Sequence, residues 1–383
     1  MKKVFFYLLI FIFMMSSSVF AADNIKIGLM APITGAWSNT GQEMKLVIDL
    51  LAEDINAKGG ILGKKIEVVT VNDEGTPQGA SQAADELVKQ SVTAVIGSLI
   101  SVATEASQIT FDKAKILQIT NASTAVTLTE KNLKYFFRTC PRDDEQSRVI
   151  AQTIRKMKLK KIAILYDKTA PYAVSLASDV RKHTKKEHID IVFDGPLDPG
   201  LEDYVDILNT IKSKNPDLVF FAGYYVETAN LLRKKKDMDW KVVFIGGDGA
   251  NNPDLITMAG KTSAEGFYFI SPPLPGELIT ENANKFILKF KEKNGYPPRS
   301  IDSILAGDAF RVIINAIGET KSTDPDILAN HLHSSFVDES GLTGRINFNA
   351  KGDRMTDLYG VYRVDAGGRF IVQRIFQYGE IVK

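Results

Sequence analysis

The sequence predicts an α/β protein of two doubly wound parallel-sheet lobes, joined by a hinge that the chain crosses several times. Short apolar segments alternate with helical patterns in two tandem series, which is typical of doubly wound sheets. A stiff segment rich in proline and glycine, SPPLPGELIT at residues 271–280, follows the second series. The segments beyond it contain too few strands for a third parallel sheet. We therefore expect this tail to pack back on the two lobes.

The first series alternates strands and helices up to residue 138. Apolar residues alternate between Ile25 and Leu29, as in a strand, and recur at helical spacing between Met44 and Ile55. The other expected elements are strands at 65–72, 94–97 and 116–120, helices at 77–90 and 102–114, and a closing segment at 135–138. Two of these strands flank a helix, which predicts a parallel βαβ unit with a right-handed crossover.

The second series and the tail account for the rest of the chain. The expected helices are 145–157, 172–186, 204–214, 226–236 and 255–259, and the expected strands are 161–166, 189–193, 218–222, 242–245 and 266–270. The tail is expected to form helices 282–294, 302–318 and 326–333 and strands 345–348, 358–364 and 369–376. A turn at 365–368 should join the last two strands.

Two polar loops should lie at one edge of the first sheet. Ser98–Ser101 and Asn121–Thr124 each follow a predicted strand, and ligands of such sheets bind beyond the carboxyl ends of the strands. The first loop also begins a helix, where free N–H groups and the helix dipole favour an anion. These loops predict a pocket for a small carboxylate or phosphate. Alternatively, Ser101 only caps the helix, as serine often does.

Composition and charge are those of a globular protein. The chain has 383 residues, of which 44% are apolar and 24% charged. This length allows two domains, and the composition is too apolar for a disordered chain. The formal net charge is +1, which implies no basic face, so we do not expect nucleic acid as a partner.

The N-terminus has the three parts of a secretory signal peptide. Lys2 and Lys3 form its basic start, Val4 to Met15 are uninterrupted apolar residues, and a small-residue cleavage signal ends at Ala21. We expect cleavage after Ala21. An uncleaved anchor is the alternative, although the apolar run is shorter than the ~20 residues of a bilayer span.

Cys140 is the only cysteine of the chain, so no internal disulfide can form. None lies at the expected cleavage site, which argues against a lipid anchor. We expect Cys140 to be a small buried residue rather than a reactive thiol.

Several sequence words occur in an order that resembles one family. They are IKIGLMAPITG at 25–35, DINAKGGILGKKIEVV at 54–69, VIGSLISVAT at 95–104, ILQITNAST at 116–124, KIAILYDKTAPYA at 161–173, LVFFAGYYVET at 218–228 and VFIGGDGA at 243–250. DINAKGGILG is the most specific of them. Together with the exported N-terminus, they resemble the periplasmic solute-binding proteins of ABC transporters, in the branch that binds leucine, isoleucine and valine.

This resemblance covers essentially the whole chain after the signal peptide and implies a type I periplasmic binding fold. Lobe 1 would comprise residues 22–141 and 273–346, and lobe 2 residues 142–272 and 347–383. In this family two lobes close on an amino acid. By resemblance, the α-carboxylate of the ligand would meet Ser101, Thr124 and the backbone at Leu99 and Ala122. The second lobe would contribute Tyr172, Tyr224 and an acidic residue for the α-ammonium group, Asp248.

Departures from the family pattern leave the identity of the ligand open. Asp248 with Gly249 could be only a turn, and the family often has glutamate in place of Asp248. Thr40 stands where the family commonly has an aromatic residue, and Trp37 is the candidate to replace that aromatic wall. Aliphatic amino acids therefore lead, followed by other amino acids and then by amides or aromatic acids that lack an amine.

No enzyme signature is present in the sequence. It contains no GxSxG or HExxH motif, and its four histidines do not group with cysteine at the spacing of metal ligands. We therefore expect no catalysis, cofactor or metal. The leading hypothesis is a monomeric periplasmic transport receptor that delivers an amino acid to the membrane permease of an ABC transporter. The alternatives are a ligand-sensing module of the same fold and an exported hydrolase, for which no nucleophile–base set is found.

Overall fold

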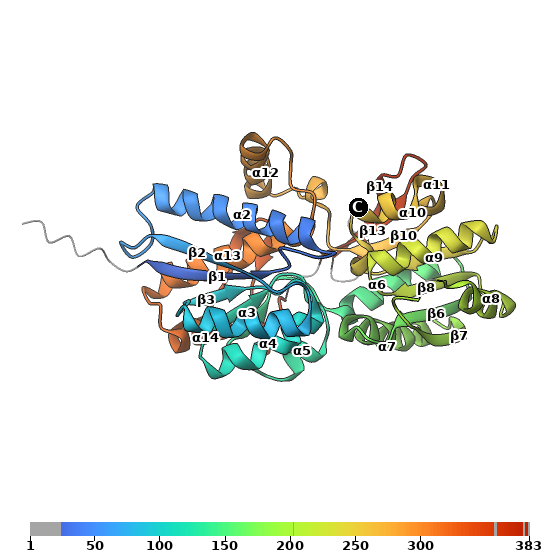
Figure 1. Cartoon of the computed structure of the whole chain (residues 1–383), viewed down its shortest axis with the longest axis horizontal. Helices are drawn as coiled ribbons and strands as arrows, with labels where there is room; N and C mark the ends of the chain where they lie inside the picture. The colour runs from blue at the N-terminus through green and yellow to red at the C-terminus, as the bar shows by residue number, and fades with distance from the viewer. Residues whose placement is uncertain (1–23, 202, 356–357, 378–379, 382–383) are drawn as a thin grey trace, which may run out of the picture.

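The computed structural model describes residues 24–201, 203–355, 358–377 and 380–381. The expected signal peptide, residues 1–21, lies outside the described residues. Two α/β lobes lie side by side, as Figure 1 shows, and the fold class predicted from the sequence is confirmed. Within the described ranges, none of the helices has the length and apolar character that a membrane span requires.

The first lobe is built on a five-stranded sheet with the order β2-β1-β3-β4-β5. Its strands are β1 (Ile25–Ala31), β2 (Ile66–Asn72), β3 (Ala94–Ile96), β4 (Leu117–Thr120) and β5 (Phe136–Arg138). Its helices in this part of the chain are α2 (Ser38–Ala57), α3 (Pro77–Lys89), α4 (Ser101–Lys113) and α5 (Thr127–Glu130). All neighbouring strands of this sheet are parallel, which confirms the predicted βαβ unit β3-α4-β4.

Both faces of this sheet are covered. Neighbouring side chains of a strand point to opposite faces, and the side chains of β1 pack in two different cores. Ile27 and Leu29 of β1 pack in one core, which also contains Met44 of α2. Met30 packs in a second core with Leu87 of α3. The two cores, one on each face of the sheet, therefore fix the position of the edge where β3 and β4 end.

The second lobe is built on an eight-stranded sheet with the order β15-β14-β13-β10-β9-β8-β6-β7. Its parallel strands are β6 (Lys161–Asp167), β7 (Asp190–Leu197), β8 (Leu218–Ala222), β9 (Val243–Gly246) and β10 (Tyr268–Ser271). The antiparallel strands β13 (Leu358–Val364), β14 (Phe370–Gln377) and β15 (Glu380–Ile381) extend one side of it. The predicted parallel sheet is therefore present, and the last strands of the chain enlarge it.

Helices and short turns cover both faces of this second sheet. They are α6 (Asp143–Lys156), α7 (Pro171–Lys186), α8 (Val205–Ser213), α9 (Tyr225–Asp237), α10 (Asp254–Ala259) and α11 (Lys261–Ala264), with the 3-10 turn η1 (Asp248–Ala250) after β9. Phe221 of β8 packs in a core with Leu232 of α9, whereas Phe220 packs in another core with Leu176 of α7.

The tail packs back on both lobes, as its lack of parallel strands predicts. It contains the 3-10 turn η2 (Pro275–Glu277), the helices α12 (Glu281–Asn294), α13 (Ile301–Thr320) and α14 (Pro325–Ser334) and the hairpin β11 (Asp338–Gly341) with β12 (Gly344–Ile346). Ile313 and Ile317 of α13 share a core with Ile48 of α2 in the first lobe. The chain then returns to the second lobe as β13. The lobe boundaries at residues 141, 272 and 346 stay a prediction.

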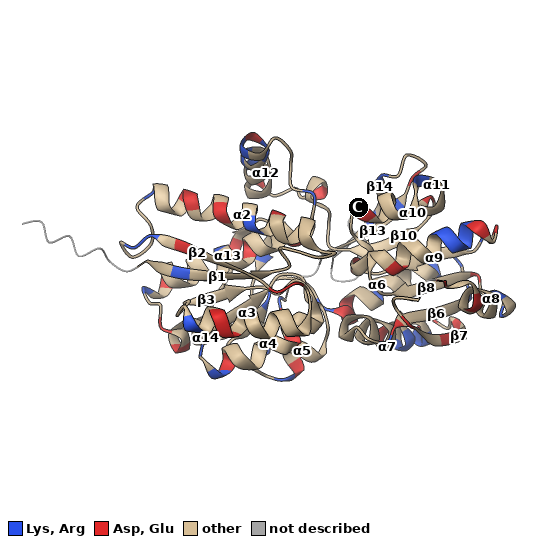
Figure 2. Cartoon of the chain, in the orientation of Figure 1, with Lys and Arg blue, Asp and Glu red and all other residues tan. Residues whose placement is uncertain are grey.

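Charged residues of both signs are spread over the two lobes (Figure 2). The run Lys234–Lys236 lies in the last turn of α9, where cations oppose the negative end of the helix dipole. Cys140 is buried, with 1% of its surface exposed, as expected for a small packed residue. Burial raises the pKa of its thiol far above the ordinary value.

Candidate functional site

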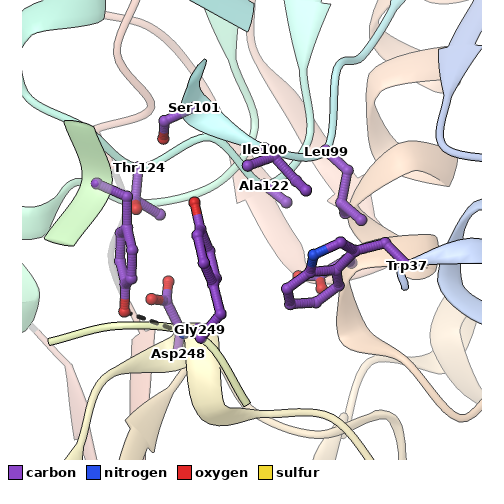
Figure 3. Close-up of a pocket in the computed structure, with 11 residues that line it drawn as sticks. Trp37, Leu99, Ile100, Ser101, Ala122, Thr124, Asp248 and Gly249 are labelled. Carbon is purple, nitrogen blue, oxygen red and sulfur yellow. Dashed lines mark hydrogen bonds between the residues drawn. The ribbon is translucent and has the colours of Figure 1, made fainter. Parts of the chain in front are cut away.

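A pocket between the facing edges of the two sheets brings together all eight residues that the sequence placed in a binding site. It is lined by Trp37, Leu99, Ser101, Ala122, Thr124, Tyr172, Tyr224 and Asp248, and also by Ile100, Gly249 and Asp302. Figure 3 shows Ser101 and Thr124 on one side, Asp248 and Gly249 facing them, and Trp37 with Leu99 at the other end.

Ser101 is the first residue of α4, and it does not cap that helix. The N-cap is Ile100, which offers no side-chain hydrogen bond, so the interpretation of Ser101 as a mere cap is wrong. The Oγ atom of Ser101 accepts a hydrogen bond of 3.4 Å from the backbone N–H of Ala125. Its hydroxyl proton can therefore be donated into the pocket. The first N–H groups of α4 have no acceptor within the helix and add to this anion-binding character.

The two loops of the first lobe are tied to each other through the carbonyl oxygen of Ser98. This oxygen accepts hydrogen bonds from the hydroxyls of Thr120 at 2.7 Å, Ser123 at 3.2 Å and Thr104 at 3.3 Å. Thr104 belongs to α4, whereas Thr120 ends β4 and Ser123 lies in the loop that contains Thr124. The donors of both loops are thereby held in one fixed arrangement before a ligand arrives, which lowers the entropy cost of binding.

Two tyrosines form the wall contributed by the second lobe. The rings of Tyr172 and Tyr224 stack with their centroids 5.4 Å apart, and Tyr224 meets Trp37 edge-on, also at 5.4 Å. The hydroxyl oxygen of Tyr172 accepts a hydrogen bond of 3.0 Å from the backbone N–H of Gly249. The hydroxyl oxygen of Tyr224 is buried and has no hydrogen-bond partner among the described residues. It is free to bond to a ligand.

Gly249 allows η1 to approach these tyrosines closely. A Cβ atom at this position would lie 2.7 Å from the carbonyl oxygen of Gly223, 2.8 Å from the ring of Tyr172 and 3.1 Å from the ring of Tyr224. Any larger residue would force the turn and the rings apart. The glycine after Asp248 is therefore a packing requirement of the pocket wall.

Asp248 supplies a carboxylate to this wall. Its Oδ1 atom is buried without a hydrogen-bond partner in the described part of the chain. Burial raises the pKa of Asp248 to about 6, and hydrogen bonds from Tyr172 and Gln146 oppose the rise. Asp248 does begin a short turn, but a turn alone does not account for a side chain that lines the pocket. A buried carboxylate that has an unsatisfied oxygen and no cationic partner is costly, and it favours a cationic ligand group.

Two further carboxylates near the pocket had no role in the sequence-based site. Asp143 begins α6 and is fully buried, and its backbone N–H donates to the carbonyl oxygen of Thr124 at 3.1 Å. Burial, and then the charge of Asp248, raise the pKa of Asp143 well above its usual range. Asp302, the second residue of α13, lines the pocket itself. The sequence pattern did not indicate that Asp302 belongs to the pocket, because only the structure shows where the tail of the chain packs.

The charged residues that line the pocket are all acidic. Asp248 and Asp302 are among the eleven lining residues, and none of the eleven is Lys, Arg or His. The ligand must therefore bring its own positive charge or hydrogen-bond donors. In the described ranges no group of three or more His, Cys, Asp or Glu side chains is placed to hold a metal ion.

The lobes touch each other around the pocket. The hydrogen bonds that cross between them include Tyr225 Oη to Ala36 O at 2.7 Å, Asn39 Nδ2 to Asp254 Oδ2 at 2.9 Å, and Val126 N to Ser175 Oγ at 3.2 Å. Trp37 also packs edge-on against Tyr225, with ring centroids 5.0 Å apart. These contacts describe a closed arrangement in which both lobes can bond to one small molecule.

Comparison with known proteins extends over nearly all of the described chain. Residues 24–369 match the family model described as periplasmic binding protein. The leucine-, isoleucine-, valine-, threonine-, and alanine-binding protein of Pseudomonas aeruginosa is 31% identical over 345 residues, which are 89% of this chain and 90% of that protein.

Solved structures are similar over the same length. The leucine-binding protein of Thermotoga maritima superposes with a TM-score of 0.86 at 26% identity, covering 92% of this chain and 99% of the other. The branched-chain amino acid transporter substrate-binding protein of Streptococcus pneumoniae, solved in complex with isoleucine, has a TM-score of 0.84 at 27% identity. That comparison covers 94% of this chain and 100% of the other.

Proposed function

The chain belongs to the periplasmic binding protein family, and from this premise we propose that it is the solute-binding component of an ABC importer. It binds a small α-amino acid between its two lobes and delivers it to the membrane permease. The ligand-binding residues are those that the sequence indicated: Trp37, Leu99, Ser101, Ala122, Thr124, Tyr172, Tyr224 and Asp248.

One observation carries this proposal: donors for an anion and an acceptor for a cation face each other across a single pocket. The hydroxyl of Ser101 and the free N–H groups of α4 lie in the first lobe, whereas the carboxylate of Asp248 lies in the second. An α-amino acid carries both charges on neighbouring atoms, so it can bond to both lobes at once. Each such charge-assisted bond contributes about 1.5–3 kcal/mol.

Asp248 also argues against acids that lack an amine. A benzoate would satisfy Ser101 but would leave the Oδ1 atom of Asp248 buried without a partner, and a simple amide could donate an N–H to it but would bring no positive charge. The penalty for such an orphaned buried charge is about 3–5 kcal/mol. An amino acid avoids this penalty and therefore has the advantage among ligands of similar size.

Binding and closure of the lobes support each other in this proposal. The ligand bonds to groups of both lobes, so it binds the closed arrangement more tightly than an open one and shifts the population toward it. The contacts of Tyr225, Asn39 and Ser175 across the lobes supply part of the free energy of closure. Release to the permease then requires these contacts to open.

The remaining features of the proposal concern the setting of the protein. We place it outside the cytoplasm, in the periplasm, after removal of residues 1–21. It acts as a monomer, without nucleic acid or cofactor. It has no catalytic role, in keeping with relatives that are named as binding proteins.

A thermal-shift screen tests the proposal. The exported protein, unfolded and refolded to remove any carried ligand, is heated with each of the twenty amino acids, with benzoate and with 4-hydroxybenzoate. A ligand at about 100 times its Kd stabilises the folded state by about 2.7 kcal/mol. We expect one or a few amino acids to raise Tm, and the amine-free acids to have no effect. A shift with the amine-free acids alone would overturn the proposal.

A further inference from the structure

We propose that Asp302 selects the side chain of the ligand, and that the amino acid bound carries a hydrogen-bond donor at the end of a short side chain. The donor is a hydroxyl, a carboxamide N–H or an ammonium group. This inference rests on the proposed function and narrows it, because it excludes purely hydrocarbon side chains as the preferred ligands.

The start of α13 holds Asp302 beside α2, the helix that follows Trp37. Glu43 of α2 accepts hydrogen bonds from the backbone N–H of Ser300 and from the hydroxyl of Ser303, on either side of Asp302. Trp37 is the N-cap of that same helix, and both Trp37 and Asp302 line the pocket. If Ser101 and Thr124 hold the α-carboxylate and Asp248 the ammonium group, the side chain extends along the rest of the lining, where Asp302 is the remaining carboxylate.

Asp302 has an oxygen available for a ligand. Its backbone N–H donates to the hydroxyl of Ser300 at 3.1 Å, and its carbonyl oxygen accepts from Asn121 at 2.9 Å. The hydroxyl of Ser300 also reaches Oδ2 at 3.4 Å. Within the described residues, Oδ1 has no hydrogen-bond partner. The backbone of Asp302 is thus held in place, and one carboxylate oxygen of this pocket-lining residue is left without a partner among the described residues.

In the described part of the chain, no cationic side chain forms an ion pair with Asp302. The guanidinium group of Arg299 lies over the ring of Tyr296, 4.5 Å from its centroid, and makes no ion pair with Asp302. Glu43 is itself occupied by the backbone N–H groups of Arg299 and Ser300 and by the hydroxyl of Ser303. Burial first, and then the negative charges of Asp248 and Glu43, raise the pKa of Asp302.

A hydrocarbon side chain would therefore be a poor occupant of this end of the pocket. It would remove water from Asp302 without replacing the lost hydrogen bond, and an unsatisfied polar group costs about 1–3 kcal/mol, more when it is charged. A side chain that ends in a donor restores the bond. Burial, with the charge of Asp248 as a second cause, raises the pKa of Asp302 to about 7. A donor from the ligand stabilises the charged carboxylate and lowers this pKa again.

Isosteric ligand pairs test this inference directly. Threonine and valine have nearly the same shape, as do asparagine and leucine, but only the first member of each pair has a donor. We expect calorimetry on the exported protein to give a Kd at least about tenfold lower for the donor in one or both pairs, the scale of a hydrogen bond to a charged group. In Asp302→Leu the ratio should fall to one or reverse.

Two further variants separate selection from a structural role. Asp302→Asn keeps the size and one acceptor oxygen, so it should fold like the parent and retain part of the preference. Asp143→Asn removes a buried carboxylate beside Thr124 and should change both Kd values of a pair by the same factor. Circular dichroism and Tm confirm that each variant is folded.

The outcomes distinguish this inference from the function on which it rests. Hydrocarbon ligands that bind as tightly as their donor partners, or a ratio that is the same in the parent and in both Asp302 variants, would overturn the role of Asp302 and leave an amino-acid receptor standing. The absence of binding by every amino acid would overturn the proposed function as well.

Discussion

The hydroxyl of Tyr225 donates a hydrogen bond of 2.7 Å to the backbone carbonyl of Ala36, and this bond joins the two lobes next to the pocket. Ala36 precedes the Trp37 wall, and Tyr225 follows Tyr224 in the chain. The contact therefore connects the aromatic linings contributed by the two lobes. Closure and the shape of the pocket depend on the same few residues.

Tyr225→Phe should weaken ligand binding without removing any group that touches the ligand. The lost bond is worth about 1 kcal/mol, so the open arrangement gains in population and the apparent Kd rises by about fivefold. Small-angle scattering should show a larger radius of gyration for the ligand-free variant. Tyr268→Phe, in β10, is the matched control. An unchanged Kd and an unchanged radius would show that this bond does not hold the lobes together.

Ser101→Ala should raise the Kd for the amino acid by about tenfold, because one donor to the carboxylate is lost while α4 keeps its N-terminal N–H groups. Isothermal calorimetry measures the effect. Ser81→Ala, on the exposed face of α3, removes a hydroxyl that bonds only to Pro77 at 2.9 Å and should leave the Kd as it is. Equal affinity of the parent and Ser101→Ala would remove Ser101 from the site.

Asp248→Asn should abolish high-affinity binding and yet stabilise the ligand-free protein at neutral pH. Burial raises the pKa of Asp248 from 3.8 to about 6, so the folded state binds a proton more tightly than the unfolded chain. The contribution of Asp248 to stability is therefore lost as the pH rises through 6. The cost at about pH 7.5 is about 3 kcal/mol, which corresponds to about 4 °C in Tm for a chain of this length.

The pH dependence of that stabilisation provides its control. The gain in Tm of Asp248→Asn over the parent should be smaller at about pH 5 than at about pH 7.5, because the parent carboxyl is largely protonated at the lower pH. A variant that is less stable than the parent at both pH values would indicate that the carboxylate has a structural role.

Binding itself should weaken in acid. The ammonium group of the ligand requires the charged form of Asp248, so binding lowers the pKa of that carboxyl and releases a proton when the pH is near 6. Affinity should fall by up to about tenfold for each pH unit below this value. Calorimetry in buffers of different ionisation enthalpy measures the protons released. Proton uptake on binding near pH 6 would contradict the pairing of Asp248 with the ammonium group.

Gly249→Ala should damage the site more than its single methyl group suggests. The added Cβ would lie 2.8 Å from the ring of Tyr172, so the turn and the stacked tyrosines must separate. We expect the Kd to rise by about tenfold or more and Tm to fall, at the cost of about 1–3 kcal/mol that overpacking carries. Gly276→Ala, where a Cβ meets nothing within 4 Å, is the control.

The position of Ser101 and Thr124 at one edge of the sheet was predictable, because it depends on local order in the chain. Ser101 and Thr124 follow two consecutive strands of one βαβ unit, so the parallel sheet places them at the same edge. Asp248 follows β9 of the second sheet in the same way. The resemblance to a family supplied the roles of these residues, which periodicity alone did not.

The rest of the site depends on long-range packing that no local pattern reports. Asp302 lies in α13, whose apolar face binds to α2 of the first lobe after the chain has passed through the second. Asp143 lies at the first turn of α6, which begins earlier than the apolar spacing indicates because three acidic residues favour the N-terminus of the helix. The strand β11, with the polar sequence DESG, has no apolar alternation to reveal it.

A crystal structure of the exported protein with the amino acid that gives the largest thermal shift tests the central claim most directly. We predict that the α-carboxylate lies within hydrogen-bond distance of Ser101 Oγ and the first N–H groups of α4, and that the α-ammonium lies within reach of the carboxylate of Asp248. A ligand bound in one lobe only, or with its amine directed away from Asp248, would contradict the account.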